Sequence, residues 1–248
     1  MILLNNFYGV TFKADLSKPI EIGIAVQRSE SVASFGIAGA IYQDYRDGSF
    51  VGNINLGGPC NLETITFTPH GNSTHTECLG HISKEPKFVN DCIQDTYCMS
   101  KLWTLSPSYT GEHHPLDFSS CDFTELSQCD ALIIRSLPNV SSKINQDYSG
   151  ENAPYIDISD MKKIVAAGIE HLIIDLPSVD PEWDNGELAA HHIFWNYPIS
   201  PRTSASITEF AFIPNDVVDG SYLLKLNISN FVSDAAPSRP VLYPIIAG

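Results

Sequence analysis

The chain has 248 residues, of which 43% are hydrophobic and 17% are charged. This composition is typical of a folded globular protein and excludes a long disordered region. Asp and Glu outnumber Lys and Arg by 29 to 14, which gives a formal net charge of −15. Nucleic acids and anionic membrane surfaces need a basic face, so we expect neither as a partner.

The sequence also bears on where the chain is found. No apolar run approaches the roughly 20 residues that a membrane span requires, and the start, Met1–Phe7, lacks the basic flank of a signal peptide. The six cysteines form no paired C-x-x-C pattern. In a chain of this size they are interpreted as thiols in a reducing compartment, which predicts a cytoplasmic protein.

The first half of the chain predicts strands and loops. Ile20–Val26 alternates as a strand does, and Arg46-Asp47-Gly48 sits between two strand-like runs of Ala40–Ile54, which indicates a hairpin. Leu62–Thr68 is a further predicted strand that leads directly into a histidine-rich stretch. Residues 83–128 have weak periodicity, and we expect loops and short helices there.

The second half predicts an alternation of strands and helices. Asp157 or Ser159 can cap a helix that runs to Ala167. A second helix is expected over 187–195. The predicted strands cover 131–137, 171–176, 206–213, 222–228 and 241–246. Because strands outnumber helices, we expect one mixed α/β domain over residues 1–248, built on a large central β-sheet.

The most informative segment runs from His70 to His81 and holds three of the eight histidines together with a carboxylate. Imidazole and carboxylate ligands suit Zn²⁺, Mn²⁺ or Fe²⁺. His75 and Glu77 are two residues apart, so on a strand both side chains point to the same side. Gly71 lets the chain bend so that His70 can turn back to the same centre. The alternative is a polar loop with solvated histidines.

This segment resembles a family signature. His75-x-Glu77-x-Leu79-x-His81, preceded by Ser73-Thr74, is similar to His-x-Gly-Thr-His-x-Asp-x-Pro-x-His, found in the cyclase family of metal-dependent hydrolases, which includes bacterial kynurenine formamidase and isatin hydrolase. The resemblance implies that His75 and Glu77 are metal ligands and that His81 is the catalytic acid and base. It also implies a swivelling β/β/α, cyclase-like fold.

The chain departs from this signature at four positions. Glu77 replaces aspartate, Leu79 replaces proline and Ser73 replaces glycine. The first histidine, His70, stands five residues before His75 instead of four, and Gly71 occupies the expected position. Either a one-residue bulge brings His70 to the metal, which we favour, or the protein lacks that ligand.

Two later segments resemble the rest of the family site. Residues 188–195 are similar to the family's Ala-His helix and assign His191 as a ligand, with His192 on a different helical face. Residues 206–210 are similar to the strand with the family glutamate and assign Glu209. The alternatives are a core histidine at position 191 and a solvated strand face at position 209.

Other polar residues are expected to be ordinary surface groups. His113 and His114 lie in the irregular middle of the chain, where a surface loop is the favoured interpretation. Asp175 stands at the end of the strand predicted at 171–176, and three acidic residues follow the strand, namely Asp180, Glu182 and Asp184. We expect a solvated acidic loop there.

The resemblance implies hydrolysis of an amide C–N bond in a small-molecule substrate, of the aryl formamide or cyclic amide type, by a metal-activated water. It implies zinc, or alternatively manganese, as one or two divalent ions, and a homodimer or homotetramer. Three alternatives stay open. The same fold can act on a lactone, cyclic imide or carbamate, the ligands can belong to a histidine-rich barrel oxygenase, or the protein can bind metal or ligand without catalysis.

Overall fold

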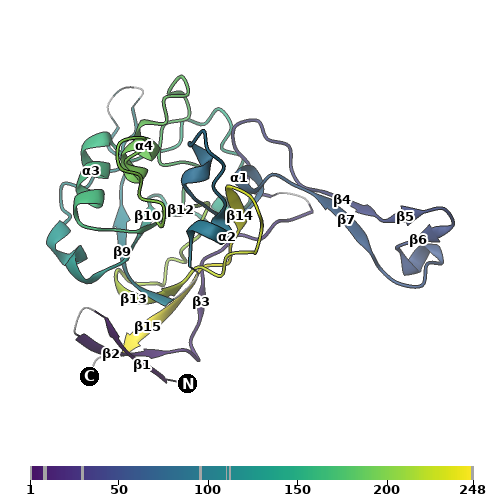
Figure 1. The fold of residues 1–248 in the computed structure, drawn as a ribbon, viewed down its shortest axis with the longest axis horizontal. Helices are drawn as coiled ribbons and strands as arrows, with labels where there is room; N and C mark the ends of the chain where they lie inside the picture. The colour runs from purple at the N-terminus through teal and green to yellow at the C-terminus, as the bar shows by residue number, and fades with distance from the viewer. Residues whose placement is uncertain are drawn as a thin grey trace.

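The protein is built on one large mixed β-sheet, seen in a computed structural model that describes residues 2–7, 10–28, 31–94, 97–109, 111 and 113–246. Within these residues the sheet has eleven strands in the order β1-β2-β15-β13-β9-β10-β11-β12-β8-β14, with β3 paired to β15. Helices cover it (Figure 1). The predicted mixed α/β fold with a large central sheet is therefore confirmed.

The strands of this sheet share one continuous ladder. In chain order they are β1 (Ile2–Phe7), β2 (Val10–Asp15), β3 (Ile20–Glu21), β8 (His75–Glu77), β9 (Tyr97–Leu105), β10 (Ala131–Ser136), β11 (His171–Ile174), β12 (Ser206–Glu209), β13 (Gly220–Lys225), β14 (Ala235–Pro237) and β15 (Val241–Ile246).

The helices are short. The α-helices are α1 (Pro69–Asn72), α2 (Val89–Cys92), α3 (Ile158–Ala166) and α4 (Ala189–Trp195), and the 3₁₀ turns are η1 (Ile54–Leu56), η2 (Leu79–His81), η3 (Phe123–Gln128) and η4 (Ser141–Asn145). None of the helices in the described part of the chain has the length and apolar character that a membrane crossing demands.

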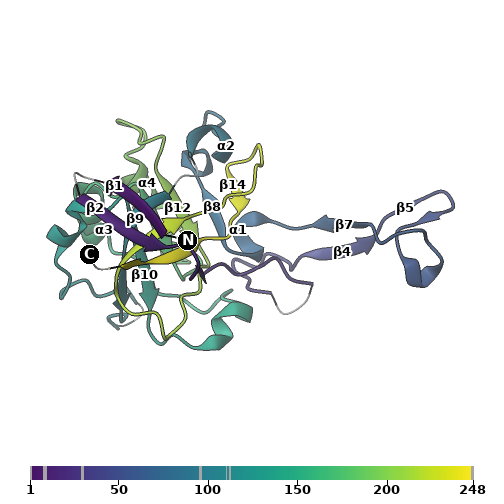
Figure 2. The ribbon, with the colours of Figure 1, turned by 90° about the horizontal axis from the view of Figure 1, so that it is seen from below.

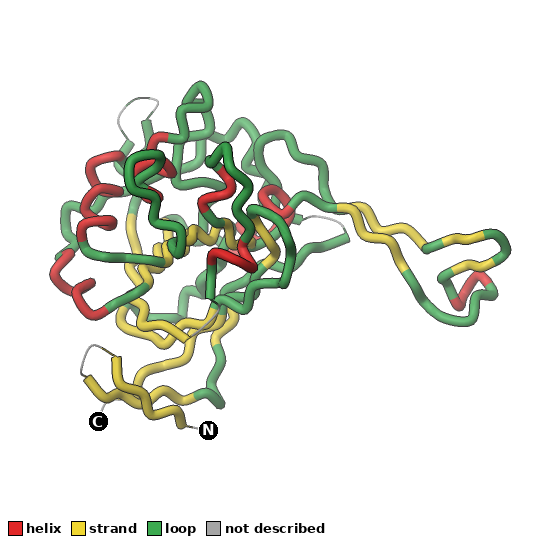
Figure 3. The backbone as a smooth tube through the Cα atoms, in the orientation of Figure 1, coloured by secondary structure: helices red, strands yellow, loops and turns green. Residues whose placement is uncertain are grey.

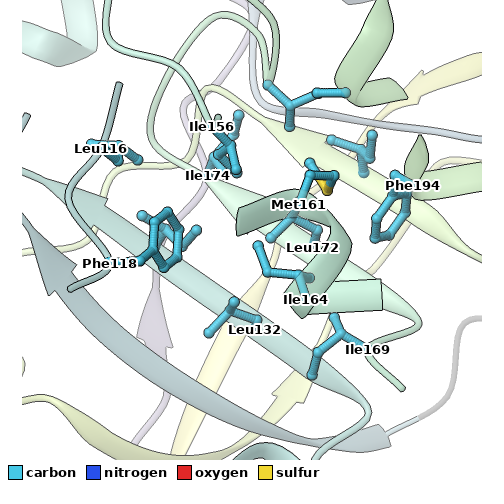
Figure 4. Close-up of a cluster of buried hydrophobic side chains, with 14 of the residues drawn as sticks. Leu116, Phe118, Leu132, Ile156, Met161, Ile164, Ile169, Leu172, Ile174 and Phe194 are labelled. Carbon is cyan, nitrogen blue, oxygen red and sulfur yellow. The ribbon is translucent and has the colours of Figure 1, made fainter. Parts of the chain in front are cut away.

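The hydrophobic core lies between the parallel centre of the sheet and the two longest helices. Strands β9, β10, β11 and β12 run parallel, and every residue of β10 is buried, as expected for a strand covered on both faces. Met161 and Ile164 of α3 and Phe194 of α4 pack on Leu132 and Leu172 of these strands (Figure 4). This core gives the C-terminal ends of the strands a rigid support.

At one edge the sheet turns antiparallel. Strand β8 pairs with β12 on one side and with β14 on the other. The register places Glu209 of β12 opposite His75, and Ala235 of β14 opposite Glu77. Three chain segments that are far apart in sequence therefore meet at this edge.

A two-stranded arm projects from the body (Figures 1 and 2). Strands β4 (Ile41–Asp44) and β7 (Glu63–Thr66) form its stem, and β5 (Arg46–Asp47) and β6 (Phe50–Val51) form a hairpin near its tip. The hairpin predicted around Asp47 is present, although each of its strands is only two residues long. The arm exposes the apolar side chains of Ile41 and Ile65.

The middle of the chain differs most from the sequence-based expectation. Residues 83–128 hold the nine-residue strand β9 in the centre of the sheet, where loops and short helices were predicted. Its sequence mixes Lys101, Ser100 and Thr104 with apolar residues, so it lacks the apolar run that marked β10. The strand predicted at 20–26 is also shorter, because only Ile20–Glu21 pairs in the ladder. The two helices predicted in the second half of the chain, α3 and α4, agree with the prediction within two residues, and helices are coloured red in Figure 3.

Candidate metal centre

The antiparallel edge of the sheet gathers the imidazoles and carboxylates that the sequence singled out. His75 and Glu77 lie on β8, and His70 lies on α1 just before it. Glu209 ends β12 and His191 lies on α4. Both β8 and β12 are completely buried, so these ionisable groups are removed from water.

The pairing of β8 with β12 brings the most buried residues of the cluster together. His75 faces Glu209 across the β8–β12 ladder, and its Nε2 lies 3.4 Å from the Glu209 Oε2. Ligand atoms of His75, Glu77 and Glu209 all lie within 4.8 Å of one another. The prediction that His75 and Glu77 share one side of a strand is thus confirmed. The solvated strand face considered for Glu209 is wrong, because this residue is only 4% exposed.

The shifted histidine reaches the cluster as well. The short helix α1 turns His70 back so that its Nδ1 lies 3.2 Å from the Glu77 Oε2. Position 71 cannot hold a side chain in this packing, since a Cβ at Gly71 would lie 2.7 Å from atoms of Ile37. Ile37 thus excludes a histidine from position 71, where the family signature places it.

His191 enters from the other side with Asp180 behind it. Its Nε2 lies 3.2 Å from the Glu77 Oε1 and 3.8 Å from the Glu209 Oε1, while its Nδ1 lies 2.5 Å from the Asp180 Oδ2. Asp180 also accepts the backbone N–H groups of Ala190 and His191. The expectation of a solvated loop at Asp180 is therefore wrong, because a helix start and an imidazole enclose this carboxylate.

His81 lies at the exposed rim of the cluster. The strand ends at Glu77, as a turn near Gly80 suggested, and η2 carries His81 to within 3.7 Å (Nδ1) of the Glu77 Oε2. Its ring centroid lies 4.4 Å from that of His70 and 5.4 Å from that of His191. His70, Glu77 and His81 form a second set with ligand atoms within 4.8 Å of one another.

One imidazole nitrogen and two carboxylate oxygens of the cluster are buried without a hydrogen-bond partner among the described residues. His75 donates through Nδ1 to the carbonyl of Ser73, and its buried Nε2 has no hydrogen-bond partner among the described residues. The Glu77 Oε2 and Glu209 Oε1 are equally buried and without such a partner there. A neutral imidazole has one N–H, and its other nitrogen carries a lone pair. When that nitrogen faces a carboxylate oxygen, the two lone pairs repel each other unless a proton or a metal ion lies between them. The donor set therefore fits a divalent metal.

The same arrangement perturbs the pKa values. Burial alone would lower the pKa of His70 and His191, but the neighbouring carboxylates, Asp234 and Glu77 at His70 and Asp180 and Glu77 at His191, raise both to about 10. Burial would raise the pKa of Glu77, yet the surrounding imidazoles, His81 first, hold it well below the usual range. The cluster attracts positive charge, with protons in the role that a metal ion can take.

One carboxylate at this site was missed in the sequence. Asp234 directly precedes β14, and its Oδ2 lies 2.8 Å from the His70 Nε2 and 3.5 Å from the His81 Nδ1. Its two imidazole neighbours hold the pKa of Asp234 well below the usual range. No motif surrounds this aspartate, and only the pairing of β14 with β8 brings it to the cluster.

A cavity of about 550 Å³ opens onto the cluster. His70, His81, His191 and Glu209 line one side of it. The other walls are largely apolar and include Phe35, Ile37, Pro177, Pro181 and Leu188. Glu182 and Asp184, expected in a solvated loop, also border this space. Its size suits a small molecule with an apolar body.

Comparison with known proteins identifies the family. The model of a family described as "Putative cyclase" matches residues 14–181. The chain belongs to this family. The cyclase-family resemblance stated from the histidine motif is thereby confirmed. His191, Glu209 and Asp234 all lie beyond the matched residues.

Curated relatives of this cyclase-family chain span nearly its whole length. The kynurenine formamidase of Bacillus cytotoxicus is 26% identical over 236 residues, which cover 93% of this chain and 97% of that protein. The kynurenine formamidase of Bacillus cereus is 23% identical, with the same two coverages. The hydrolase class expected from the sequence agrees with these names.

Solved structures share the fold. A predicted metal-dependent hydrolase from Bacillus stearothermophilus superposes with a TM-score of 0.63 at 14% identity and covers 91% of this chain and 98% of its own. Isatin hydrolase A from Labrenzia aggregata, bound to benzyl benzoate, gives a TM-score of 0.63 at 10% identity, with coverages of 91% and 93%. The cyclase-like fold is thus confirmed.

His114, His192 and Asp175 make contacts outside the cluster. The His114 Nδ1 lies 3.2 Å from the carbonyl oxygen of Asn152, and the His192 Nδ1 lies 3.2 Å from that of Tyr197, so both are engaged away from the cluster. Asp175, expected in a solvated loop, is instead buried in an ion pair with Lys143, with 2.7 Å between Oδ2 and Nζ.

Proposed function

We propose that this chain is a metal-dependent hydrolase that cleaves the C–N bond of an aryl formamide or a cyclic amide. The observation that carries the proposal is the group of buried imidazole nitrogens and carboxylate oxygens that face one another, among which the His75 Nε2, the Glu77 Oε2 and the Glu209 Oε1 have no hydrogen-bond partner in the described part of the chain. The family and the kynurenine formamidase relatives support the reaction class. The apolar walls of the adjoining cavity suit an aromatic substrate.

In this proposal the ligands are the five residues that face the centre of the cluster. They are His70, His75, Glu77, His191 and Glu209. A bound divalent cation, zinc or alternatively manganese, would supply a Lewis acid that polarises the amide carbonyl and lowers the pKa of bound water towards about 7. The two overlapping ligand sets, which share Glu77, leave room for one ion or two.

His81 is proposed as the group that moves protons. It lines the cavity, is partly exposed, and lies at the rim of the cluster, not at its buried centre. From there it takes a proton from the attacking water and passes it to the leaving amine as the C–N bond breaks. Leu188 and Pro181 add apolar surface to the wall of the same cavity.

Chelation tests the metal dependence. Turnover of an N-formyl arylamine and of an aromatic cyclic amide is measured before and after treatment with a strong chelator, and again after addition of zinc or manganese. We expect loss of turnover and recovery with one of the two metals. The same panel includes a lactone, a cyclic imide and a carbamate. Full activity in protein shown to be metal-free would refute the proposal.

Substitution of two histidines, one inside the cluster and one outside it, separates catalysis from metal binding. His81→Ala is expected to retain the bound metal and to lose about 10²–10⁴-fold in kcat. His192→Ala is the matched control, because the His192 ring lies against Tyr197 outside the cluster. Normal turnover by His81→Ala would remove the role assigned to this residue.

The remaining expectations are part of the same proposal. We propose a homo-oligomer, dimer or tetramer, which the exposed apolar residues of the arm support. The six cysteines are all free thiols, which supports a reducing compartment such as the cytoplasm.

A further inference from the structure

We propose that Asp234 is a positioning residue that orients two histidines of the site at once. It would hold His70 with Nδ1 towards the metal ligand Glu77, and hold His81 with Nε2 free for proton transfer. The first half of this inference rests on the metal site and the second on the proposed hydrolase function.

The contacts of Asp234 reach both rings. Its Oδ2 lies 2.8 Å from the His70 Nε2 and 3.5 Å from the His81 Nδ1. The opposite nitrogen of His70, Nδ1, lies 3.2 Å from Glu77. A carboxylate that accepts the N–H of one ring nitrogen fixes the tautomer and turns the other nitrogen's lone pair towards the metal. The same arrangement at His81 leaves Nε2 as the nitrogen for acid and base work.

The backbone holds Asp234 in this place. Its carbonyl accepts the N–H of Cys78, and β14, which follows it, pairs with β8, the strand of Glu77. Gly80 allows the η2 turn to approach, since a Cβ there would lie 3.1 Å from the Asp234 Cβ and 2.1 Å from the carbonyl oxygen of Lys87. The backbone of Asp234 is therefore held in place by β8, the strand that carries His75 and Glu77.

A matching pair on the other side of the cluster shows what such a carboxylate does. Asp180 stands behind His191 as Asp234 stands behind His70, and in both cases the second nitrogen of the ring lies 3.2 Å from Glu77. Asp180 is buried, whereas the Asp234 side chain is 37% exposed. The exposed member of the pair can be replaced with little cost to folding.

Three variants test the inference. Asp234→Asn removes the charge at constant shape, Asp234→Glu keeps a carboxylate, and Asp160→Asn removes a carboxylate from a surface ion pair with Lys163 as the matched control. Zinc affinity is measured by competition with a chromophoric chelator. We expect Asp234→Asn to bind zinc about 10–100-fold more weakly, Asp234→Glu to recover part of the loss, and Asp160→Asn to match the unmodified chain.

Kinetics with saturating zinc test the second half. In Asp234→Asn we expect a lower kcat for the aryl formamide at nearly constant KM, because the ring that moves the proton is misaligned while the cavity is intact. Unchanged zinc affinity and unchanged kcat in Asp234→Asn would overturn the inference, as would an equal loss in Asp160→Asn. If the unmodified chain hydrolyses no amide, the proposed function fails, and the zinc competition still decides the role of Asp234 towards His70.

Discussion

At the scale of single residues, the site is defined by which imidazole nitrogen faces which oxygen. Each of His70, His75 and His191 has one ring nitrogen on an outer acceptor, namely Asp234, Ser73 or Asp180. The other nitrogen of each ring faces Glu77 or Glu209. Repulsion between lone pairs at those contacts is relieved by a cation, so the inner contacts make this a candidate metal centre.

The residue types and most positions of the site could be predicted from sequence. The parity of His75 and Glu77 follows from strand geometry, and the structure bears it out. The place of His70 could not be derived, because it depends on Ile37, which lies 33 positions earlier and fills the space beside Gly71. Asp234 could not be found either, since only strand pairing relates it to the histidines.

The contact between Gly71 and Ile37 is testable by a double-mutant cycle. Gly71→Ala places a Cβ 2.7 Å from Ile37, so we expect displacement of α1, a lower melting temperature and weaker zinc binding. Ile37→Ala removes two of the three obstructing atoms, Cγ2 and Cδ1, and leaves the Cβ. The double variant should then be more stable than the sum of the two single effects predicts. Strict additivity would show that this contact does not hold His70 in place.

The metal-free protein should respond to pH through its imidazoles. The pKa of His70 and His191 is raised to about 10 from 6.5, so their stabilising contribution is complete below pH 6.5 and is lost as the pH rises towards 10. We expect the free energy of unfolding, measured with urea in the presence of chelator, to fall between about pH 7 and about pH 8.5.

Zinc affinity should change in the opposite direction over the same interval, because the ligands must lose their protons to bind the metal. The ¹⁵N shifts of the imidazoles give an independent readout, since in the metal-free protein His191 should remain protonated at about pH 8. Stability that rises between about pH 7 and about pH 8.5 would contradict this interpretation.

At the scale of elements, apolar patterning identified the buried strands and failed where polar residues interrupt them. Strands β10 and β11 were predicted from their continuous Leu and Ile runs. Strand β9 was missed, since Lys101 and Thr104 break the pattern, and its neighbours supply partners for these groups. Lys101 pairs with Glu125, and Thr104 hydrogen-bonds Asp219. Tertiary context there outweighs the local pattern.

The helix that covers the core begins at Asp157, one of the two caps that the sequence predicted. Asp157 accepts the backbone N–H of Ser159 at 2.8 Å, at the start of α3. Asp157→Ala should lower the free energy of unfolding by about 1 kcal/mol, measured by urea denaturation, without changing metal content. Ile158→Ala is the control, because this residue is also in the first turn of α3, its side chain is apolar and 44% exposed, and its backbone N–H is retained. A loss in the control as large as that in Asp157→Ala would show that this cap does not stabilise the helix.

At the scale of the whole molecule, the arm formed by β4, β5, β6 and β7 projects from the body (Figures 1 and 2). Its stem has only two strands, and the register places Ile41 and Ile65 on opposite faces. An isolated two-stranded hairpin is marginally stable in water, and both isoleucines are about half exposed (51% and 47%). These features support the proposed self-association, in which a further copy covers the arm.

Light scattering tests the assembly. We expect the mass in solution to be two or four times the 27.2 kDa of one chain. Replacement of Ile41 and Ile65 together by aspartate should lower the mass to that of one chain. Ile199→Asp is the control, since Ile199 is 88% exposed and lies outside the arm. A single-chain mass for the unmodified protein would exclude the proposed oligomer.

The central claim, that imidazoles and carboxylates from remote segments share a cation, is tested most directly by anomalous scattering. Crystals grown with zinc are measured at the zinc edge. The account predicts one or two strong peaks within bonding distance, about 2.0–2.2 Å, of Glu77 and of the imidazoles around it. Zinc-saturated crystals with no peak inside this cluster would contradict it.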